Sequence, residues 1–224
     1  MAIEVSVVRV FTDADGRFGN PLGIVDAQAV GESDRQDVAR QLGFSETVFV
    51  DRSSPGTASA TIYTPATQLP FAGHPTVGLS WWLRNNGHSV QTLTVPAATL
   101  DIRYDGELTW VRARAEWTPQ FTFHQVHDAA EVAAADPNTY DSGHHYIWAW
   151  TDEQRAELRS RMFAPMMGIA EDEATGAAAV RLTAELGRGL NIVQGAGSAL
   201  WTTVDEDGWV ELGGRSVDDD SITV

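Results

Sequence analysis

The chain has 224 residues, of which 43% are hydrophobic and 21% charged, as is typical of a soluble globular protein with a core. Its length suits one large domain or two small ones, and no run of about 18 apolar residues indicates a membrane span. The opening MAIEVSVVRVF is typical of a strand and not of a secretory signal peptide, so we expect a cytoplasmic protein. A net charge of −16 argues against nucleic acid and anionic membranes as partners.

Two amino acids are absent from the chain. There is no cysteine, which excludes disulfides, thiolate metal sites and thiol nucleophiles. All 15 basic residues are arginine, and without lysine there is no internal Schiff base and no P-loop lysine. Any chemistry must therefore use carboxylates, histidines, hydroxyls and backbone amides. An anionic substrate would be bound by helix N-termini or by single arginines.

The first half of the chain alternates short strands with two helices. Strands are predicted over residues 5–11, 23–27, 45–51 and 58–65, and a hairpin over 99–114 turns at Asp105-Gly106. Helices are predicted over 34–42, with Ser33 as N-cap and Gly43 as C-terminal stop, and over 76–86.

The second half repeats this rhythm more loosely. Strands are predicted over 117–123 and 144–150, and a hairpin over 200–214 turns at Asp207-Gly208 and is followed by an acidic tail, 218–221. An exposed helix is predicted over 152–162 and an apolar helix over 177–186. No Pro/Ser-rich linker separates the halves, so we expect two packed halves rather than two tethered domains.

A sequence similarity between two segments of the chain supports the division into two halves. GHPTVGLSWWL (73–83) and EDEATGAAAVRL (171–182) each place a polar residue before a glycine-containing entry into an apolar helix. Aligning His74 with Asp172 sets Gly78 against Gly176. A helix that is apolar all round must be enclosed, and short strands can enclose it as a strongly bent sheet. The pattern predicts an α+β protein in which a sheet wraps around a helix in each half.

Glu46 lies in FSETVFV, at the mouth of a predicted strand and between apolar residues. Burial of a carboxyl at this position would raise its pKa towards the range of a general base. The alternative is an exposed carboxylate, or a capping partner, at a strand edge.

His74 precedes the first apolar helix. Gly73 permits a close backbone approach and Pro75 suits the first helical position, so His74 is predicted beside a helix N-terminus that can bind an anion. The alternative is a histidine that caps the helix and binds nothing.

Asp172 stands before a second helix N-terminus of the same kind, which begins at Thr175-Gly176. The alternative is that Asp172 serves only as an N-cap. Glu173 complements the helix dipole and needs no other role on this interpretation.

Other candidates are weaker. The histidines 124, 127, 144 and 145 have spacings that match no zinc motif well, so surface positions on strands are the favoured interpretation. GNPLG (19–23) is not a dinucleotide-binding fingerprint, and no serine lies in a GxSxG elbow.

Taken together, several strings resemble the PhzF family, phenazine-biosynthesis-type isomerases related to diaminopimelate epimerase. They are FGNPLGIV (18–25), SETVFV (45–50), QLPFAGHPTVG (68–78), EDEATGAAA (171–179), VQG (193–195) and VELGG (210–214). They occur in family order over nearly the whole chain. The resemblance implies a diaminopimelate epimerase-like fold of two halves, 1–112 and 113–224, with the active site in the cleft between them.

The resemblance also implies a reaction and a site. Glu46 would be the general acid/base that moves a proton between two carbons of a small unsaturated amino or hydroxy carboxylic acid. His74 and Asp172 would face it across the cleft, and the backbone around Gly73 and Gly176 would bind the substrate carboxylate. Thr175 and Ala177 would complete the substrate site. The resemblance implies a homodimer, and it implies neither a metal nor an organic cofactor.

The chain departs from the family pattern in its second half, which is also short. The usual DPATGSA reads DEATGAA, so proline becomes Glu173 and a serine hydroxyl is lost at Ala177. The segment after Gln194-Gly195 reads AGSALWTT in place of Gly-Arg-Pro-Ser. Two alternatives to an isomerase therefore stay open. One is a catalytically silent ligand-binding member, and the other is a lyase, dehydratase or pericyclic-type enzyme of secondary metabolism.

Overall fold

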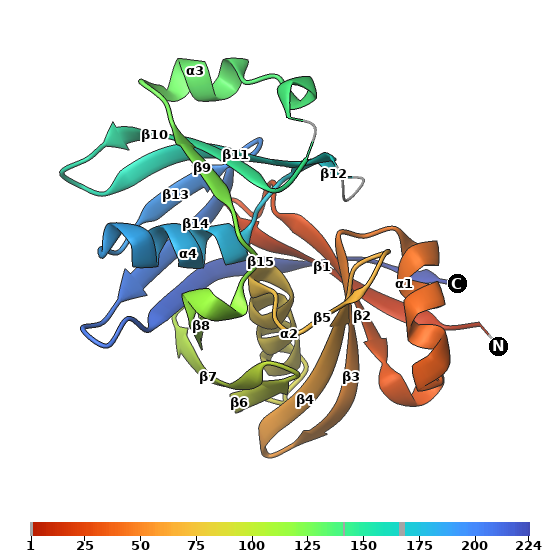
Figure 1. Cartoon of the computed structure of the whole chain (residues 1–224). Helices are drawn as coiled ribbons and strands as arrows, with labels where there is room; N and C mark the ends of the chain where they lie inside the picture. The colour runs from red at the N-terminus through yellow and green to blue at the C-terminus, as the bar shows by residue number, and fades with distance from the viewer. Residues whose placement is uncertain (1, 141, 166–168) are drawn as a thin grey trace.

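A computed structural model describes residues 2–140, 142–165 and 169–224 of the chain. It is an α+β protein whose two halves each carry a helix packed against a curved sheet (Figure 1). Within the described residues, no helix has the length and apolar character needed to cross a membrane.

The first half is a closed ring of strands around a helix. Its elements are β1 (Glu4–Thr12), β2 (Asn20–Asp26), α1 (Arg35–Leu42), β3 (Glu46–Ser54), β4 (Gly56–Tyr63), β5 (Gln68–Leu69), α2 (Gly73–Asn85), β6 (Val90–Val95), β7 (Ala98–Asp105) and β8 (Leu108–Ala113). Hydrogen bonds follow the order β1-β2-β3-β4-β6-β7-β8-β15, and the ring closes because β15 (Val210–Thr223) also pairs with β1. Helix α2 lies inside this ring (Figure 1).

The second half is an open sheet that covers the other helix. Its elements are β9 (Thr122–Gln125), α3 (Ala129–Ala134), β10 (His145–Asp152), β11 (Glu157–Ala164), β12 (Ile169–Asp172), α4 (Gly176–Leu186), β13 (Asn191–Gln194) and β14 (Ser198–Val204). The strand order is β15-β14-β13-β11-β10-β9, and α4 packs on β14 and β15.

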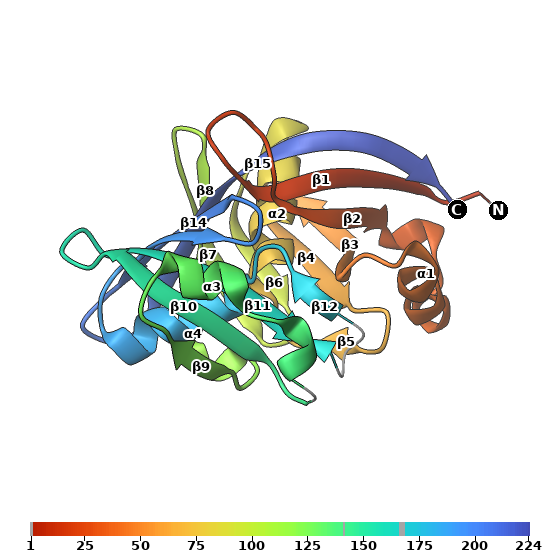
Figure 2. The ribbon, with the colours of Figure 1, turned by 90° about the horizontal axis from the view of Figure 1, so that it is seen from above.

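Strand β15 belongs to both sheets. Its first residues pair with β8 and β14, and its later residues run antiparallel to β1. The two strands lie side by side as far as the chain ends, where Ile3 and Val224 exchange backbone hydrogen bonds (Figure 2). The predicted α+β fold is confirmed, whereas the division into residues 1–112 and 113–224 stays a prediction.

Helix α2 is enclosed over its first two turns, where the hydroxyls of Thr76 and Ser80 donate hydrogen bonds to backbone carbonyls. Every residue from Gly73 to Ser80 is buried, and Gly78 faces side chains of β1 and β2. A Cβ at Gly78 would stand 2.5 Å from Val10 Cγ2 and 2.7 Å from Leu22 Cδ2. Glycine therefore allows the helix to lie against the strands.

The exposed helix predicted over 152–162 is wrong, because residues 157–162 belong to strand β11 and residues 153–156 form the turn that leads into it. Its Glu, Arg and Ala content favours a helix, but its burial alternates: Leu158, Ser160 and Met162 point inward while Arg159 and Arg161 do not. This period of two fits a half-buried strand, and pairing on both sides overrides the local helix propensity.

The acidic tail predicted over 218–221 is also wrong, because these residues lie in β15. Asp218 and Asp219 pair in register with Val8 and Val7 of β1. The Asp219 carboxylate lies 3.0 Å from Arg9 Nε, so a basic residue on the neighbouring strand offsets part of the charge. A local run of like charge gives no sign of this partner.

Smaller differences concern the ends of elements. Helix α1 ends at Gly43 in the left-handed conformation, as predicted, but its N-cap is Asp34 rather than Ser33. The strand predicted over 117–123 begins only at Thr122, because a 3₁₀ turn, Ala115–Trp117, comes first. The sequence interpretation missed α3, where the Asp128 side chain accepts hydrogen bonds from the first turn.

Gly78→Ala is expected to destabilise the protein although alanine favours helices. The new methyl group would meet β-branched Val10 inside contact distance, and overpacking of this kind typically costs about 1–3 kcal/mol. Urea unfolding measures the change, with Glu185→Ala on the exposed side of α4 as the control. Equal stability of Gly78→Ala and the wild type would contradict the packing described here.

Candidate active site

The first residues of α2 and α4 touch each other. A Cβ built at Gly73 would lie 2.8 Å from the Gly176 Cα, and one at Gly176 would lie 3.0 Å from the Gly73 Cα. Both would also collide with Leu212 Cδ2, at 2.6 and 2.7 Å. Any side chain at either position would push the helices apart, so glycine at both positions permits this contact.

Neither helix N-terminus is capped by a side chain. The N-cap residues are Ala72 for α2 and Thr175 for α4, and neither makes a side-chain cap hydrogen bond. The first N–H groups of a helix have no acceptor within the helix and carry the positive end of its dipole. Two such ends at one point favour the binding of an anion.

Three titratable side chains gather beside this contact. Glu46 is the first residue of β3, and its Oε2 lies 3.2 Å from Nδ1 of His74 in the first turn of α2. The Glu46 side chain is 18% exposed and that of His74 only 3%. Asp172, the last residue of β12, is buried and close enough to interact electrostatically with both.

Burial changes the protonation of all three groups. It raises the pKa of Glu46 to about 7, and contact with Ser45 offsets only part of this effect. Burial and the neighbouring Glu46 charge raise the pKa of Asp172 to about 6. Burial lowers the pKa of His74 to about 4, against the attraction of Asp172. Near neutral pH the imidazole is therefore uncharged, and the two carboxyls titrate close together.

Hydrogen bonds fix the position of Asp172. Its Oδ1 accepts from Asn20 Nδ2 at 2.7 Å and its Oδ2 accepts from Thr175 Oγ1 at 2.6 Å. Gln194 Nε2 donates to the Asp172 carbonyl at 2.9 Å and to Thr175 Oγ1 at 2.8 Å, while Gln194 Oε1 accepts from the Thr175 N–H at 3.1 Å. The Thr175 hydroxyl is thus committed to Asp172 instead of capping α4.

A cavity of about 420 Å³ opens onto these carboxyls. Its polar lining includes Glu46, Asp172, Thr175, Thr64, Glu116 and His144, and its apolar wall includes Leu69, Pro70, Phe71, Trp117, Phe121, Met162 and Ala177. No arginine is among the described residues that line it. Phe71 and Trp117 of this wall pack edge to face, with ring centroids 6.0 Å apart.

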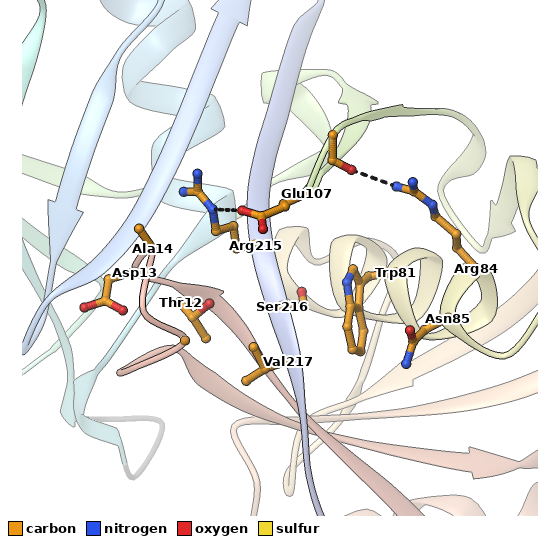
Figure 3. Close-up of a pocket in the computed structure, with 12 residues that line it drawn as sticks. Thr12, Asp13, Ala14, Trp81, Arg84, Asn85, Glu107, Arg215, Ser216 and Val217 are labelled. Carbon is orange, nitrogen blue, oxygen red and sulfur yellow. Dashed lines mark hydrogen bonds and ion pairs between the residues drawn. The ribbon is translucent and has the colours of Figure 1, made fainter.

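A second cavity, of about 440 Å³, lies by the other end of α2 and does not have the same chemistry (Figure 3). Its two arginines already have partners. Arg215 Nε lies 3.0 Å from Glu107, and Arg84 donates to the Gly106 carbonyl at 3.2 Å. Its buried hydroxyls, Thr12 and Ser216, have oxygens out of reach of solvent. The carboxyl cavity is therefore the candidate active site.

The predicted site residues are brought together, with differences of detail. Helix α4 begins at Gly176 with Thr175 as its N-cap, so Asp172 is not a helix cap. His74 lies behind Glu46 and, like Gly73 and Gly176, does not line the cavity. The alignment of Gly78 with Gly176 stays a prediction, and the glycine that contacts Gly176 in space is Gly73.

Several site residues were missed from the sequence. Asn20 lies in the conspicuous string GNPLG, but nothing local indicates that its amide reaches Asp172 across the fold. The aromatic wall formed by Phe71, Trp117 and Phe121 was not predicted either, because its members come from separate elements. Of the histidines considered in the sequence, His124 and His145 lie outside the cavity lining, with His124 Nε2 3.1 Å from His145 Nδ1. His144 lines the cavity.

Comparisons with known proteins agree with this architecture. The family model described as phenazine biosynthesis-like protein, PhzC-PhzF, matches residues 8–109 and 105–203. A trans-2,3-dihydro-3-hydroxyanthranilate isomerase of Pseudomonas chlororaphis is 29% identical over 208 residues, which cover 76% of this chain and 75% of that protein.

Solved structures show the same fold. A phenazine biosynthesis protein of the PhzF family from Enterococcus faecalis superposes with a TM-score of 0.80 at 20% identity, covering 100% of this chain and 99% of that one. A hydroxyproline epimerase from Agrobacterium vitis reaches 0.63 at 9% identity, covering 100% and 91%. The chain thus has a diaminopimelate epimerase-like fold. Within that class of folds, the chain belongs to the PhzC-PhzF family of phenazine biosynthesis-like proteins.

Glu46→Gln is expected to change how stability depends on pH. The folded chain keeps the Glu46 proton up to about pH 7, whereas the unfolded chain releases it near the usual 4.5. The native state binds more protons in this window, so stability falls as pH rises through it, by roughly 3 kcal/mol for this group. Glutamine cannot release a proton, and this part of the loss should disappear.

Urea unfolding of the wild type and Glu46→Gln between pH 4.5 and 8 measures the difference in slope. Glu206→Gln, at an exposed glutamate, is the matched control and should keep the wild-type slope. The same slope in all three proteins would mean that the Glu46 carboxyl titrates normally.

Proposed function

We propose that the protein is an isomerase in which Glu46 moves a proton between two carbons of a small carboxylic acid. The observation that carries the proposal is a carboxyl with a pKa near 7 on a cavity wall, beside two uncapped helix N-termini. The naming of the curated relatives as isomerases supports the reaction class.

The substrate carboxylate would bind at the meeting point of α2 and α4. Ala72 and Thr175 line the cavity there, and the backbone N–H groups after these two residues would be the donors, since no arginine is among the described residues of the lining. Fixed donors beside the reacting carbon also stabilise the negative charge that develops when a proton leaves it. These donors would lower the pKa of a C–H group on the carbon next to the bound carboxylate, or on a carbon conjugated with it.

Glu46 suits both halves of a proton transfer. With a pKa of about 7 it is present in both protonation states at neutral pH, so it can remove a proton from one carbon and return it to another. Neutral His74 lies 3.2 Å behind it and orients the carboxyl without adding a charge. Asp172 on the opposite side would stay ionised for most of the cycle above pH 6 and can hold a polar substituent of the substrate. No step in this scheme requires a metal or cofactor.

The lining favours a substrate with one carboxylate and a flat, largely apolar body. The apolar wall includes three aromatic side chains, Phe71, Trp117 and Phe121. The carboxyls of Glu46, Glu116 and Asp172 would repel a second anionic group on the substrate. An amino or hydroxy substituent is compatible with the acidic groups. Ala177 offers no hydroxyl to the cavity, so the backbone carries the recognition at the start of α4.

Deuterium incorporation tests the proposal. The wild type and Glu46→Gln are incubated in D2O with a panel of unsaturated amino and hydroxy acids, including a dihydro-hydroxyanthranilate, and followed by NMR. We expect deuterium to enter one carbon of an accepted compound at a rate at least about 100-fold higher with the wild type, the usual contribution of a general acid/base. Glu206→Gln serves as the control with unchanged rate.

Two results would contradict the proposal. Equal incorporation by the wild type and Glu46→Gln would remove Glu46 from the reaction. Binding of a panel member without any incorporation would favour a ligand-binding protein, and a product of different mass would indicate a lyase or dehydratase.

A further inference from the structure

The half-buried Glu173 carboxylate makes hydrogen bonds that do not depend on the helix dipole. Its Oε1 and Oε2 accept hydrogen bonds from the Ala196 N–H, at 3.0 and 2.9 Å, and Oε1 accepts another from Ser198 Oγ at 2.7 Å. Glu173 thus joins the segment before α4 to the turn between β13 and β14. A Cβ at Gly195 would overlap the carboxylate at 2.3 Å, so the turn is closed tightly around it.

Ser198 extends this contact to the first half of the protein. Its Oγ accepts a buried hydrogen bond from the Gly19 N–H at 3.0 Å. Gly19 is followed by Asn20, whose side chain donates to Asp172 at 2.7 Å and to the Ala174 carbonyl at 3.1 Å. The hydrogen bonds therefore form a closed loop. It runs from Asp172 to its neighbour Glu173, from there to Ser198, and through the Gly19–Asn20 corner back to the Asp172 carboxylate.

This loop spans the cleft between the halves. Gly19 and Asn20 lead into β2, and β2 pairs in parallel with β3 so that Leu22 stands opposite Glu46. Asp172, Glu173 and Ser198 belong to the second half. A shift of the β13–β14 turn would consequently move Asn20 and Asp172 relative to the strand that carries Glu46.

We infer that Glu173 is a positioning residue: through Ser198 and the Gly19–Asn20 corner, it holds Asp172 at a fixed place opposite the Glu46–His74 pair. Glu173 itself does not line the carboxyl cavity and need not touch a substrate. It ties together the two sides of the cleft from outside the cavity. The catalytic consequence, though not the contact itself, rests on the proposed isomerase function.

Three variants of the 224-residue chain test this role. Glu173→Ala removes the acceptor, Ser198→Ala removes the link to Gly19, and Glu173→Gln keeps the size and one acceptor oxygen. Glu206→Ala, at an exposed glutamate, is the matched control. Each variant is compared with the wild type in two measurements, one of which needs no substrate.

The first measurement is amide hydrogen exchange at Gly19. We expect exchange to accelerate about tenfold or more in Glu173→Ala and Ser198→Ala, to accelerate less in Glu173→Gln, and to stay at the wild-type rate in Glu206→Ala. Ser198→Ala removes the acceptor of the Gly19 N–H, whereas Glu173→Ala frees the hydroxyl that accepts it.

The second measurement is steady-state kinetics on the compound found by deuterium incorporation. We expect kcat to fall about tenfold in Glu173→Ala, because a displaced Asp172 would no longer orient the substrate substituent so that the reacting carbon meets Glu46. KM should stay within about twofold, because the backbone donors that bind the substrate carboxylate are untouched. Glu173→Gln should recover part of kcat. A purely structural role would lower the amount of folded enzyme and the stability without this split.

Unchanged Gly19 exchange in Ser198→Ala and Glu173→Ala would overturn the inference, as would unchanged kcat in Glu173→Ala. If Glu173→Ala fails to fold, the graded comparison of Glu173→Gln with Ser198→Ala decides the question in the same way. Absence of turnover in the wild type would count against the proposed function alone, since the exchange measurement still decides whether Glu173 holds the corner.

Discussion

The contact between Gly73 and Gly176 is the constraint on which the rest of the structure depends. Two helices from different halves of the chain begin at nearly the same point, and their first residues are so close that neither can carry a Cβ. Leu212 of β15, the strand shared by both sheets, packs against both glycines and fills the remaining space. The close approach places His74 and Asp172 near Glu46 at the mouth of one cavity. It also concentrates two helix dipoles at a point where neither helix is capped.

The electrostatics of the site follow from burial in an acidic chain without lysine. A buried carboxyl without a cationic partner holds its proton more tightly, and a second carboxyl nearby strengthens the effect for Asp172. Burial also lowers the pKa of His74, so this imidazole is neutral near pH 7. The three groups together therefore carry fewer charges than their ordinary pKa values would give. In the proposed reaction, the positive ends of the two helices would then be the main attraction for the substrate carboxylate. This balance allows a single carboxyl, Glu46, to exchange a proton near neutral pH.

The sequence predicted the parts of this account that depend on local patterns. The apolar helices, the hairpin at Asp105-Gly106 and the left-handed end at Gly43 follow from periodicity and turn chemistry, and the family strings located Glu46, His74 and Asp172. What the sequence did not predict depends on distant partners. The helix expected over 152–162 is a strand because β10 and β13 flank it, and the acidic residues at 218–221 pair with β1. Glu173 was given no role beyond the helix dipole, since its acceptor geometry is created by a turn more than twenty residues later. The homodimer and the cytoplasmic location stay predictions.

Glu46 and Asp172 form one buried pair whose members influence each other's protonation. An NMR titration of the Glu46 carboxyl carbon in the wild type and in Asp172→Asn tests this interaction. We expect a midpoint near 7 in the wild type, and a lower one in Asp172→Asn, because Asp172 ionises first and its negative charge then opposes ionisation of Glu46. A wild-type midpoint near the ordinary 4.5, or the same midpoint in both proteins, would mean that the two carboxyls do not interact.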